Sequence, residues 1–212
     1  MGQAAAVDVM QTLRDRTWEK HRLAERHPLQ HALAIGKLPR GQYAALTAQL
    51  MIVHRELFAA LNRSRAVPAI AVVLRDYHDH EPRCRRDIEH LGVDPSAVAA
   101  SVATARFVDD LKSAEARSSL DLLGALYVLE GATNGGKFIA KMVRRAYQLE
   151  GLAGTESLDP YGQAQPERWE EFKQSMRGVA FEEVEIERLV VMARRTFDAV
   201  AEIGDDVLSG RA

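Results

Sequence analysis

The 212-residue sequence has little cysteine and no excess of basic charge, and each shortage excludes a class of protein. Cys84 is the only cysteine, so the chain cannot form an internal disulfide and does not resemble a small disulfide-stabilised secreted domain. Lysine and arginine total 28 against 30 aspartates and glutamates, a formal net charge of -2. A general nucleic-acid binder needs a basic face to neutralise phosphates, so we expect no nucleic-acid partner.

Long apolar runs and a secretory signal are also missing. No stretch approaches the roughly 20 apolar residues that a membrane-spanning helix requires. The first residues have no basic region followed by an apolar run, as a secretory signal would. We therefore expect a cytoplasmic protein without a membrane partner. The hydrophobic content of 47% and charged content of 27% are typical of a globular protein with a sizeable core.

The hydrophobic pattern predicts an all-α protein, because apolar residues recur at helical spacing and no convincing strand alternation is present. Residues 151–166 are rich in Gly, Pro and Gln and predict a loop. We expect one irregular bundle of seven to nine helices over residues 1–212, with loose termini at 1–6 and 208–212. No further apolar stripe is left for a partner, so we expect a monomer. The predicted helices cover residues 7–26, 29–35, 43–61, 84–91, 118–149, 167–177 and 182–207, with others beginning near Pro68 and Asp94.

Three glycines interrupt the longest predicted helix. Gly131, Gly135 and Gly136 each cost about 1 kcal/mol relative to alanine in a helix interior, or roughly 3 kcal/mol together. Gly131 and Gly135 share a face, where bare backbone permits close approach of a second helix or of a planar ligand. The consecutive pair Gly135-Gly136 also favours a bend. The pattern alone leaves both kinds of contact open and favours the helix contact.

A histidine and a glutamate lie four residues apart on the first predicted helix. His21 and Glu25 therefore share a face. An imidazole that binds a metal commonly donates from its other nitrogen to a carboxylate, which fixes its tautomer. The same spacing is also common in simple surface pairs that contribute little to stability. The pair is thus a candidate metal ligand with its supporting carboxylate, or an ordinary surface pair.

Taken together, these motifs resemble the heme oxygenase family. Residues 13–25 are similar to its proximal helix, where a histidine followed after two residues by Ala-Glu ligates heme iron. Residues 123–136 are similar to its distal helix, especially in the bacterial branch. Residues 172–177 resemble the late helix that supplies cations to the heme propionates. The resemblance extends, with gaps, from about Leu13 to Ile203.

The resemblance implies a fold with heme between a proximal helix and a distal helix bent at its glycines. His21 would bind the iron, supported by Glu25, and the distal contacts would come from the glycines together with Thr133 and Asn134. One departure concerns Ala132, because many family members have an aspartate there that organises water. We expect Thr133 and Asn134 to supply polar groups instead. The propionate partners would be Arg14, Lys173 and Arg177, which are chemically suited to carboxylates.

The activity that the resemblance implies is oxidative cleavage of heme, which serves as both substrate and cofactor. The products would be biliverdin, carbon monoxide and ferrous iron. The reaction would consume O2 and electrons from an external reductant, either an electron-donor protein or a small molecule. Because the heme itself carries the demanding chemistry, no nucleophile and base pair is required of the protein.

Two other kinds of function remain open. The first is a heme carrier or sensor without turnover, which the absence of an aspartate at Ala132 keeps in view. The second is a relative with the same helical architecture and other chemistry. A thiaminase-like enzyme would use Cys84, whose arginine neighbours favour a lowered thiol pKa, although we expect a structural or incidental cysteine on a basic helix turn. A di-metal oxidase would draw on the candidate ligands around Pro82, although we expect those residues to be solvent-exposed; they are His78, Asp79, His80, Asp87 and His90. The remaining histidines His27, His31 and His54 are expected at the surface or at interfaces.

Overall fold

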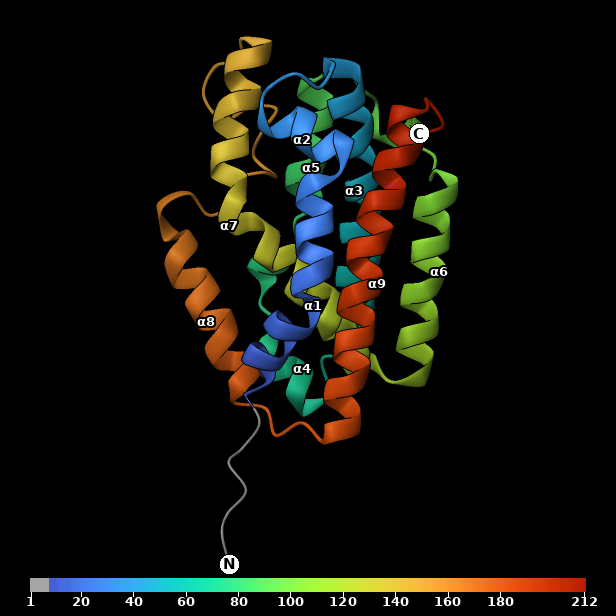
Figure 1. Cartoon of the computed structure of the whole chain (residues 1–212), viewed down its shortest axis with the longest axis vertical. Coiled ribbons are helices and arrows are strands. Elements are labelled where there is room, and N and C mark those ends of the chain that lie inside the picture. Colours follow the sequence, from blue (N-terminus) through green and yellow to red (C-terminus); the bar gives the residue numbers. More distant parts are fainter. Residues whose placement is uncertain (1–7) are drawn as a thin grey trace, which may run out of the picture.

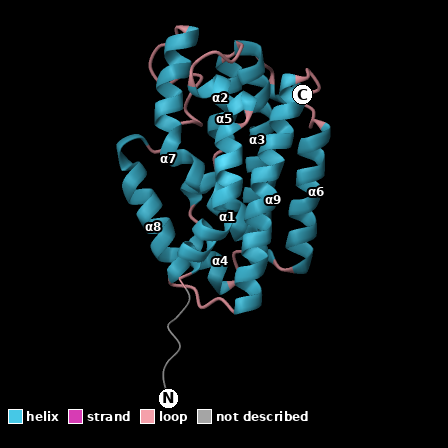
Figure 2. Cartoon of the chain, in the orientation of Figure 1, coloured by secondary structure: helices cyan, strands magenta, loops and turns pink. Residues whose placement is uncertain are grey.

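The computed structural model describes residues 8–212, and every regular element among them is helical, without a strand (Figure 2). The expected all-α class is therefore confirmed. The loose terminus expected at residues 1–6 lies outside the described residues. Nine α-helices occur within residues 8–212, in agreement with the seven to nine expected. They are α1 (Val9–Arg26), α2 (Pro28–Ala34), α3 (Arg40–Arg63), α4 (Pro68–Val73), α5 (Glu81–His90), α6 (Val102–Arg117), α7 (Leu122–Tyr147), α8 (Gln165–Arg177) and α9 (Glu183–Leu208).

Local signals in the sequence set the helix ends. Asp8 caps α1 by accepting hydrogen bonds from the backbone N–H groups of Met10 and Gln11. Pro28 separates α1 from α2, as predicted, because it disfavours helical geometry in the preceding residue. The helix expected from Asp94 begins later: residues 95–97 form a short 3-10 turn, and Ser101 caps α6.

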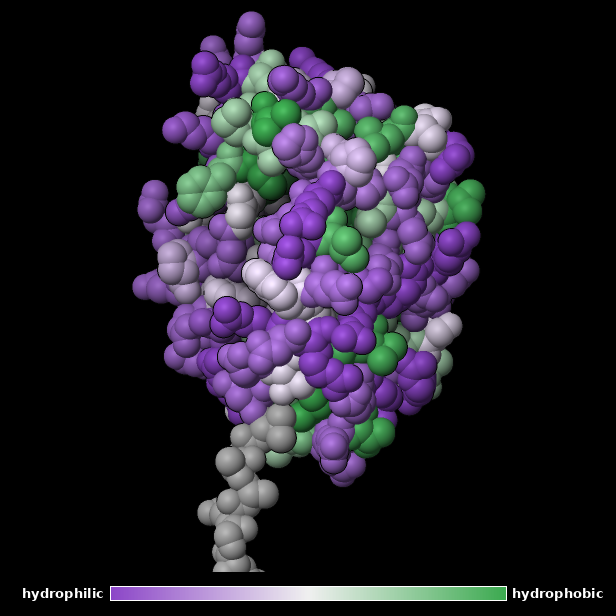
Figure 3. Space-filling model, viewed as in Figure 1, coloured by the Kyte–Doolittle hydropathy of each residue, from purple (hydrophilic) through white to green (hydrophobic). Residues whose placement is uncertain are grey.

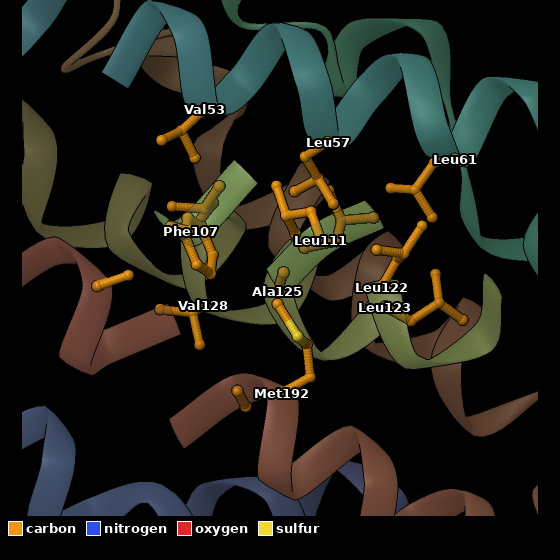
Figure 4. Packing of buried hydrophobic residues seen from close by; sticks show 14 of the residues in the cluster. Val53, Leu57, Leu61, Phe107, Leu111, Leu122, Leu123, Ala125, Val128 and Met192 are labelled. Carbon is orange, nitrogen blue, oxygen red and sulfur yellow. The ribbon is translucent and has the colours of Figure 1, made fainter. Parts of the chain in front are cut away.

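The core lies where α3, α6, α7 and α9 meet. Figure 4 shows leucines of α3 and α7 interdigitating around Phe107 and Leu111 of α6, with Met192 of α9 below them. The backbones of α7 and α9 touch, because a Cβ at Gly124 would lie 2.3 Å from the carbonyl oxygen of Leu189. This close contact fixes α7 at the centre of the molecule, where it presents one face outward.

α1 packs against α9 at the surface of this core (Figure 1). An ion pair between Lys20 Nζ and Asp198 Oδ1, at 2.6 Å, joins the two helices at mid-length. α1 therefore has one face against the bundle and another that points outward.

α3 alone among the described helices has the length and apolar composition to cross a membrane. The expectation that no segment reaches this threshold was too strict. Because 61% of the relevant window is buried inside the fold, α3 has the character of a core helix.

Candidate functional site

One face of α1 carries a stripe of exposed side chains. Arg14, Trp18, His21 and Glu25 recur at intervals of three or four residues, so they share this face, and all four are exposed. The side chain of His21 is 47% exposed although its helix is packed on the core. This stripe leaves the imidazole available to a ligand.

Three neighbours fix the His21 ring. The ring of Trp18 stacks on it with centroids 5.7 Å apart, and Phe197 of α9 meets it edge-on at 5.9 Å. Its Nδ1 lies 3.7 Å from Oε2 of Glu25, longer than a direct hydrogen bond but suited to a bridging water. Within residues 8–212 no hydrogen bond involves the other nitrogen, Nε2. Nε2 is therefore the atom best placed to coordinate a metal.

The middle of α7 also presents an open face. A Cβ at Gly135 would meet no atom within 4 Å, and one at Gly131 would meet only the Trp169 ring, at 3.6 Å. Farther along α7, Phe138 is 66% exposed. Figure 3 shows apolar surface over the upper part of this side of the molecule, where α7 and α2 lie. Bare backbone and apolar side chains at one surface favour a flat, apolar ligand.

Gly136 serves a different purpose from Gly131 and Gly135. A Cβ there would lie 1.8 Å from the carbonyl oxygen of Leu158, in the loop that follows α7. The structure thus gives two physical reasons for the three glycines, an open surface and a tight backbone contact. α7 remains one helix throughout yet changes direction near its middle, as the glycine pair predicted (Figure 1).

The open faces of α1 and α7 lie at corresponding heights. Tyr127 of α7 is close to Thr17 and Arg14 of α1; burial raises the pKa of its phenol, and these two neighbours oppose that rise. The helices run in the same direction (Figure 1), and each residue advances about 1.5 Å. His21 and Gly131, each four residues beyond the Thr17–Tyr127 contact, therefore lie at about the same level.

The predicted cations gather toward the beginning of α1. Arg177 of α8 pairs with the capping residue Asp8, with Nε and Oδ2 3.1 Å apart. Lys173, one turn earlier on α8, pairs with Glu170 at 2.6 Å. Arg14 is exposed on the same side of α1 as His21. A carboxylate ligand at Lys173 or Arg177 would therefore replace a carboxylate of the chain itself.

The two polar residues expected on the distal side differ in their placement. Thr133 is buried, and its hydroxyl donates to the carbonyl oxygen of Glu130 at 2.6 Å. Asn134 is exposed; its side-chain amide donates to the Gly131 carbonyl at 2.9 Å and its oxygen accepts from Gln165 at 3.3 Å. Asn134, and not Thr133, is therefore the polar side chain beside the open glycine face.

A buried polar cluster lies behind the glycine segment. His80 Nε2 is 2.8 Å from Oε1 of Glu130, and the hydroxyl of Tyr161 donates to Oε2 at 2.9 Å. Burial opposes ionisation of Glu130, but His80, His78 and the hydrogen bond from Tyr161 together hold the pKa of its carboxyl below the usual value. Burial lowers the pKa of His78 to about 4 and that of His54, which packs on His80, to about 3.

Sequence reasoning missed this cluster, although one signal was present. Glu130 falls on the apolar stripe of α7, between Leu126 and Thr133, so helical spacing places its carboxylate inside the protein. A buried carboxylate needs partners, and nothing in the local sequence identifies His80 and Tyr161 as those partners.

The residues around Pro82 were expected to be solvent-exposed, and for three of them this was wrong. Asp87 of α5 is covered by the loop after α7, whereas His78 packs against Phe172 of α8 and His80 against Glu130 of α7. Within residues 8–212 no group of three or more His, Cys, Asp or Glu residues is arranged to hold a metal ion. The di-metal alternative therefore has no ligand set in the described part of the chain.

The histidines expected at the surface or at interfaces occupy three environments. His31 is exposed. His27 is largely buried and caps α2, since its Nδ1 accepts from the backbone of Leu29 at 3.3 Å and its Nε2 lies 3.1 Å from Asp205. His54 is partly buried and its ring packs edge-on against His80 of the buried cluster.

Cys84 is fully buried, and burial raises the pKa of its thiol to about 12. The neighbouring arginines favour a lower pKa, but desolvation dominates, in keeping with the expected structural cysteine. A thiol with so high a pKa is a poor nucleophile at neutral pH, so the thiaminase-like alternative loses its reactive group.

The fold is a helical bundle whose first helix and glycine-rich central helix both present open faces. The chain belongs to the heme oxygenase family, whose family model matches residues 7–205. A comparison with curated proteins found no match.

Solved structures agree with this assignment at the level of the fold. Heme oxygenase-1 from the cyanobacterium Synechocystis sp. PCC 6803, solved with heme, is 18% identical with a TM-score of 0.89, over 96% of this chain and 94% of that one. Heme oxygenase from Leptospira interrogans is 19% identical with a TM-score of 0.86, over 94% and 100%. The fold extends beyond heme oxygenases: a TenA homologue from P. horikoshii OT3 is 12% identical with a TM-score of 0.67, over 96% and 100%.

Proposed function

We propose that this protein binds heme between α1 and α7 and cleaves it oxidatively to biliverdin, carbon monoxide and ferrous iron. The observation that carries the proposal is the exposed imidazole of His21 at the level of the bare backbone of Gly131. Family membership supports it, since residues 7–205 match the heme oxygenase model. When bound, heme supplies the redox chemistry that uses O2 and electrons from an external donor.

The role of His21 is to hold the iron through Nε2. Its Nδ1 faces Glu25 at 3.7 Å, so the carboxylate favours the tautomer that carries a proton on Nδ1 and a lone pair on Nε2. Trp18 and Phe197 hold the ring orientation through their aromatic contacts. Glu25 therefore acts by orienting His21, and not by touching the reacting atoms.

The remaining residues orient the ligand and shape its surroundings. Gly131 and Gly135 let the backbone of α7 approach the flat ring, while Arg14, Lys173 and Arg177 pair with its carboxylates. Ala132 offers no carboxylate on this side. Asn134, which is exposed and hydrogen-bonded to the Gly131 carbonyl, is the side chain that orders water beside the glycine face.

A hemin titration followed in air tests both the site and the activity. His21→Ala should change the visible spectrum of bound hemin, whereas His31→Ala, at another exposed histidine on a neighbouring helix, should leave it as in the wild type. With a reductant in air, the wild-type Soret band should decay into biliverdin absorption. An unchanged spectrum in His21→Ala would overturn the ligand assignment, and a Soret band that persists would establish a carrier or sensor in place of an oxygenase.

A further inference from the structure

The proposed function leaves a buried carboxylate unused. Glu130 directly precedes Gly131, and its side chain is only 4% exposed. Both carboxylate oxygens are occupied, Oε1 by His80 Nε2 at 2.8 Å and Oε2 by the Tyr161 hydroxyl at 2.9 Å. A buried charge is costly unless such partners compensate it, so this arrangement is specific to the folded state.

The loop that supplies Tyr161 contacts the glycine segment at further points. We define residues 155–165, the last part of the connection after α7 together with the first residue of α8, as the return segment. Its Leu158 carbonyl occupies the space that a side chain at Gly136 would fill, and its Gln165 donates to Asn134 at 3.3 Å. Contacts at residues 130, 134 and 136 thus span the glycine-rich part of α7.

The return segment is itself anchored on α5. Asp87 is fully buried and accepts hydrogen bonds from the backbone N–H groups of Glu156 and Ser157, both at 2.8 Å, and from the Ser157 hydroxyl at 2.6 Å. His80 occupies the position directly before the first residue of the same helix. Both partners of Glu130 are therefore tied to α5, which packs on the core helix α3.

A helix with several glycines does not hold its own geometry well, because glycine backbone is the most flexible. We propose that Glu130 is a positioning residue that, through His80 and Tyr161, holds the glycine segment of α7 with its bare face toward His21. The link to heme rests on the proposed function, whereas the link between Glu130 and the order of α7 does not.

Hydrogen–deuterium exchange of the full-length, heme-free protein tests the positioning role directly. Tyr161→Phe removes one hydrogen bond to Glu130 and should raise amide exchange in residues 131–137 about tenfold, equivalent to about 1.4 kcal/mol. Tyr147→Phe is the matched control, because it removes a partly buried hydroxyl that donates to the Leu38 carbonyl at 2.6 Å from the far end of the same helix. It should leave residues 131–137 unchanged. Glu130→Gln, which removes the charge with little change of shape, should act in the same direction as Tyr161→Phe.

The outcomes distinguish the two proposals. If Tyr161→Phe leaves exchange in residues 131–137 at the wild-type rate, or raises it equally throughout the chain, the positioning role is overturned. If the local rise occurs, the hemin affinity of Tyr161→Phe should fall several-fold because the open face of α7 is held less firmly, while its Soret position, set by His21, should match the wild type. A local rise combined with a wild-type protein that does not consume hemin would refute the oxygenase activity and leave the positioning role intact.

Discussion

Adjacent glycines of α7 should respond in opposite ways to the addition of one methyl group. Gly135→Ala and Gly136→Ala change neighbouring residues of the same helix. At Gly135 the new Cβ would meet no atom within 4 Å, whereas at Gly136 it would lie 1.8 Å from the Leu158 carbonyl oxygen. Comparing the two variants therefore separates the low helix propensity of glycine from the steric requirement for a residue without a side chain.

The expected magnitudes follow from two opposing effects. Alanine in place of glycine in a helix interior stabilises by about 1 kcal/mol, so Gly135→Ala should raise the free energy of unfolding by about that amount. Gly136→Ala gains the same helix propensity but forces the return segment away from α7, and overpacking of this kind costs about 1–3 kcal/mol. The two variants should differ by about 1–3 kcal/mol, because the propensity contribution cancels in the comparison.

Urea unfolding of the heme-free variants, monitored by circular dichroism, measures this difference. The same proteins are then titrated with hemin. Gly135→Ala should bind hemin more weakly although it is more stable, because its methyl group stands on the open face of α7. Equal stability of the two variants would mean that Leu158 does not lie against Gly136 in solution. Unchanged hemin affinity in Gly135→Ala would remove this face of α7 from the heme site.

Two further predictions concern buried titratable groups. Burial lowers the pKa of His78 from 6.5 to about 4 in the folded protein. Between these two pH values the unfolded chain binds the proton and the folded protein does not, so the free energy of unfolding decreases as the pH falls from 6.5 toward 4. The free energy of unfolding should decrease by about 2 kcal/mol between pH 7 and pH 5. Denaturant unfolding across this range measures the decrease. A His78→Gln variant whose stability has the same pH slope as the wild type would contradict the reasoning. Cys84, whose thiol pKa is raised to about 12 by burial, should resist iodoacetamide at pH 8 in the native protein and react after unfolding in urea; equal rates in both states would show that the thiol is accessible.

The helices and their ends follow closely from local sequence. Helical spacing of apolar residues placed α1, α3, α7 and α9 within a few residues, since periodicity and proline act over short distances. The beginning of α6 was misplaced, because Asp94-Pro95-Ser96 has the pattern of a helix start but forms only a short turn. The true start depends on the Ser101 cap, seven residues later than the first capping signal, Asp94.

Part of the candidate site could also be predicted from local sequence. The i, i+4 spacing of His21 and Glu25 determined that they share a face, and helix geometry alone made the pair plausible. The three glycines were visible as an anomaly, but their separate reasons were not. Gly136 is required by the Leu158 carbonyl, which lies 22 positions later in the chain.

The sequence by itself determined the helical class, the approximate helix ends and the shared faces of α1 and α7, because these depend on neighbours within a few residues. Only the tertiary structure decided which polar residues are buried. Glu130 meets His80 and Tyr161 from positions 50 and 31 residues away, and its contact with His80 is one reason why that residue near Pro82 is buried, contrary to expectation. Desolvation and pairing depend on such distant partners, which no local pattern encodes.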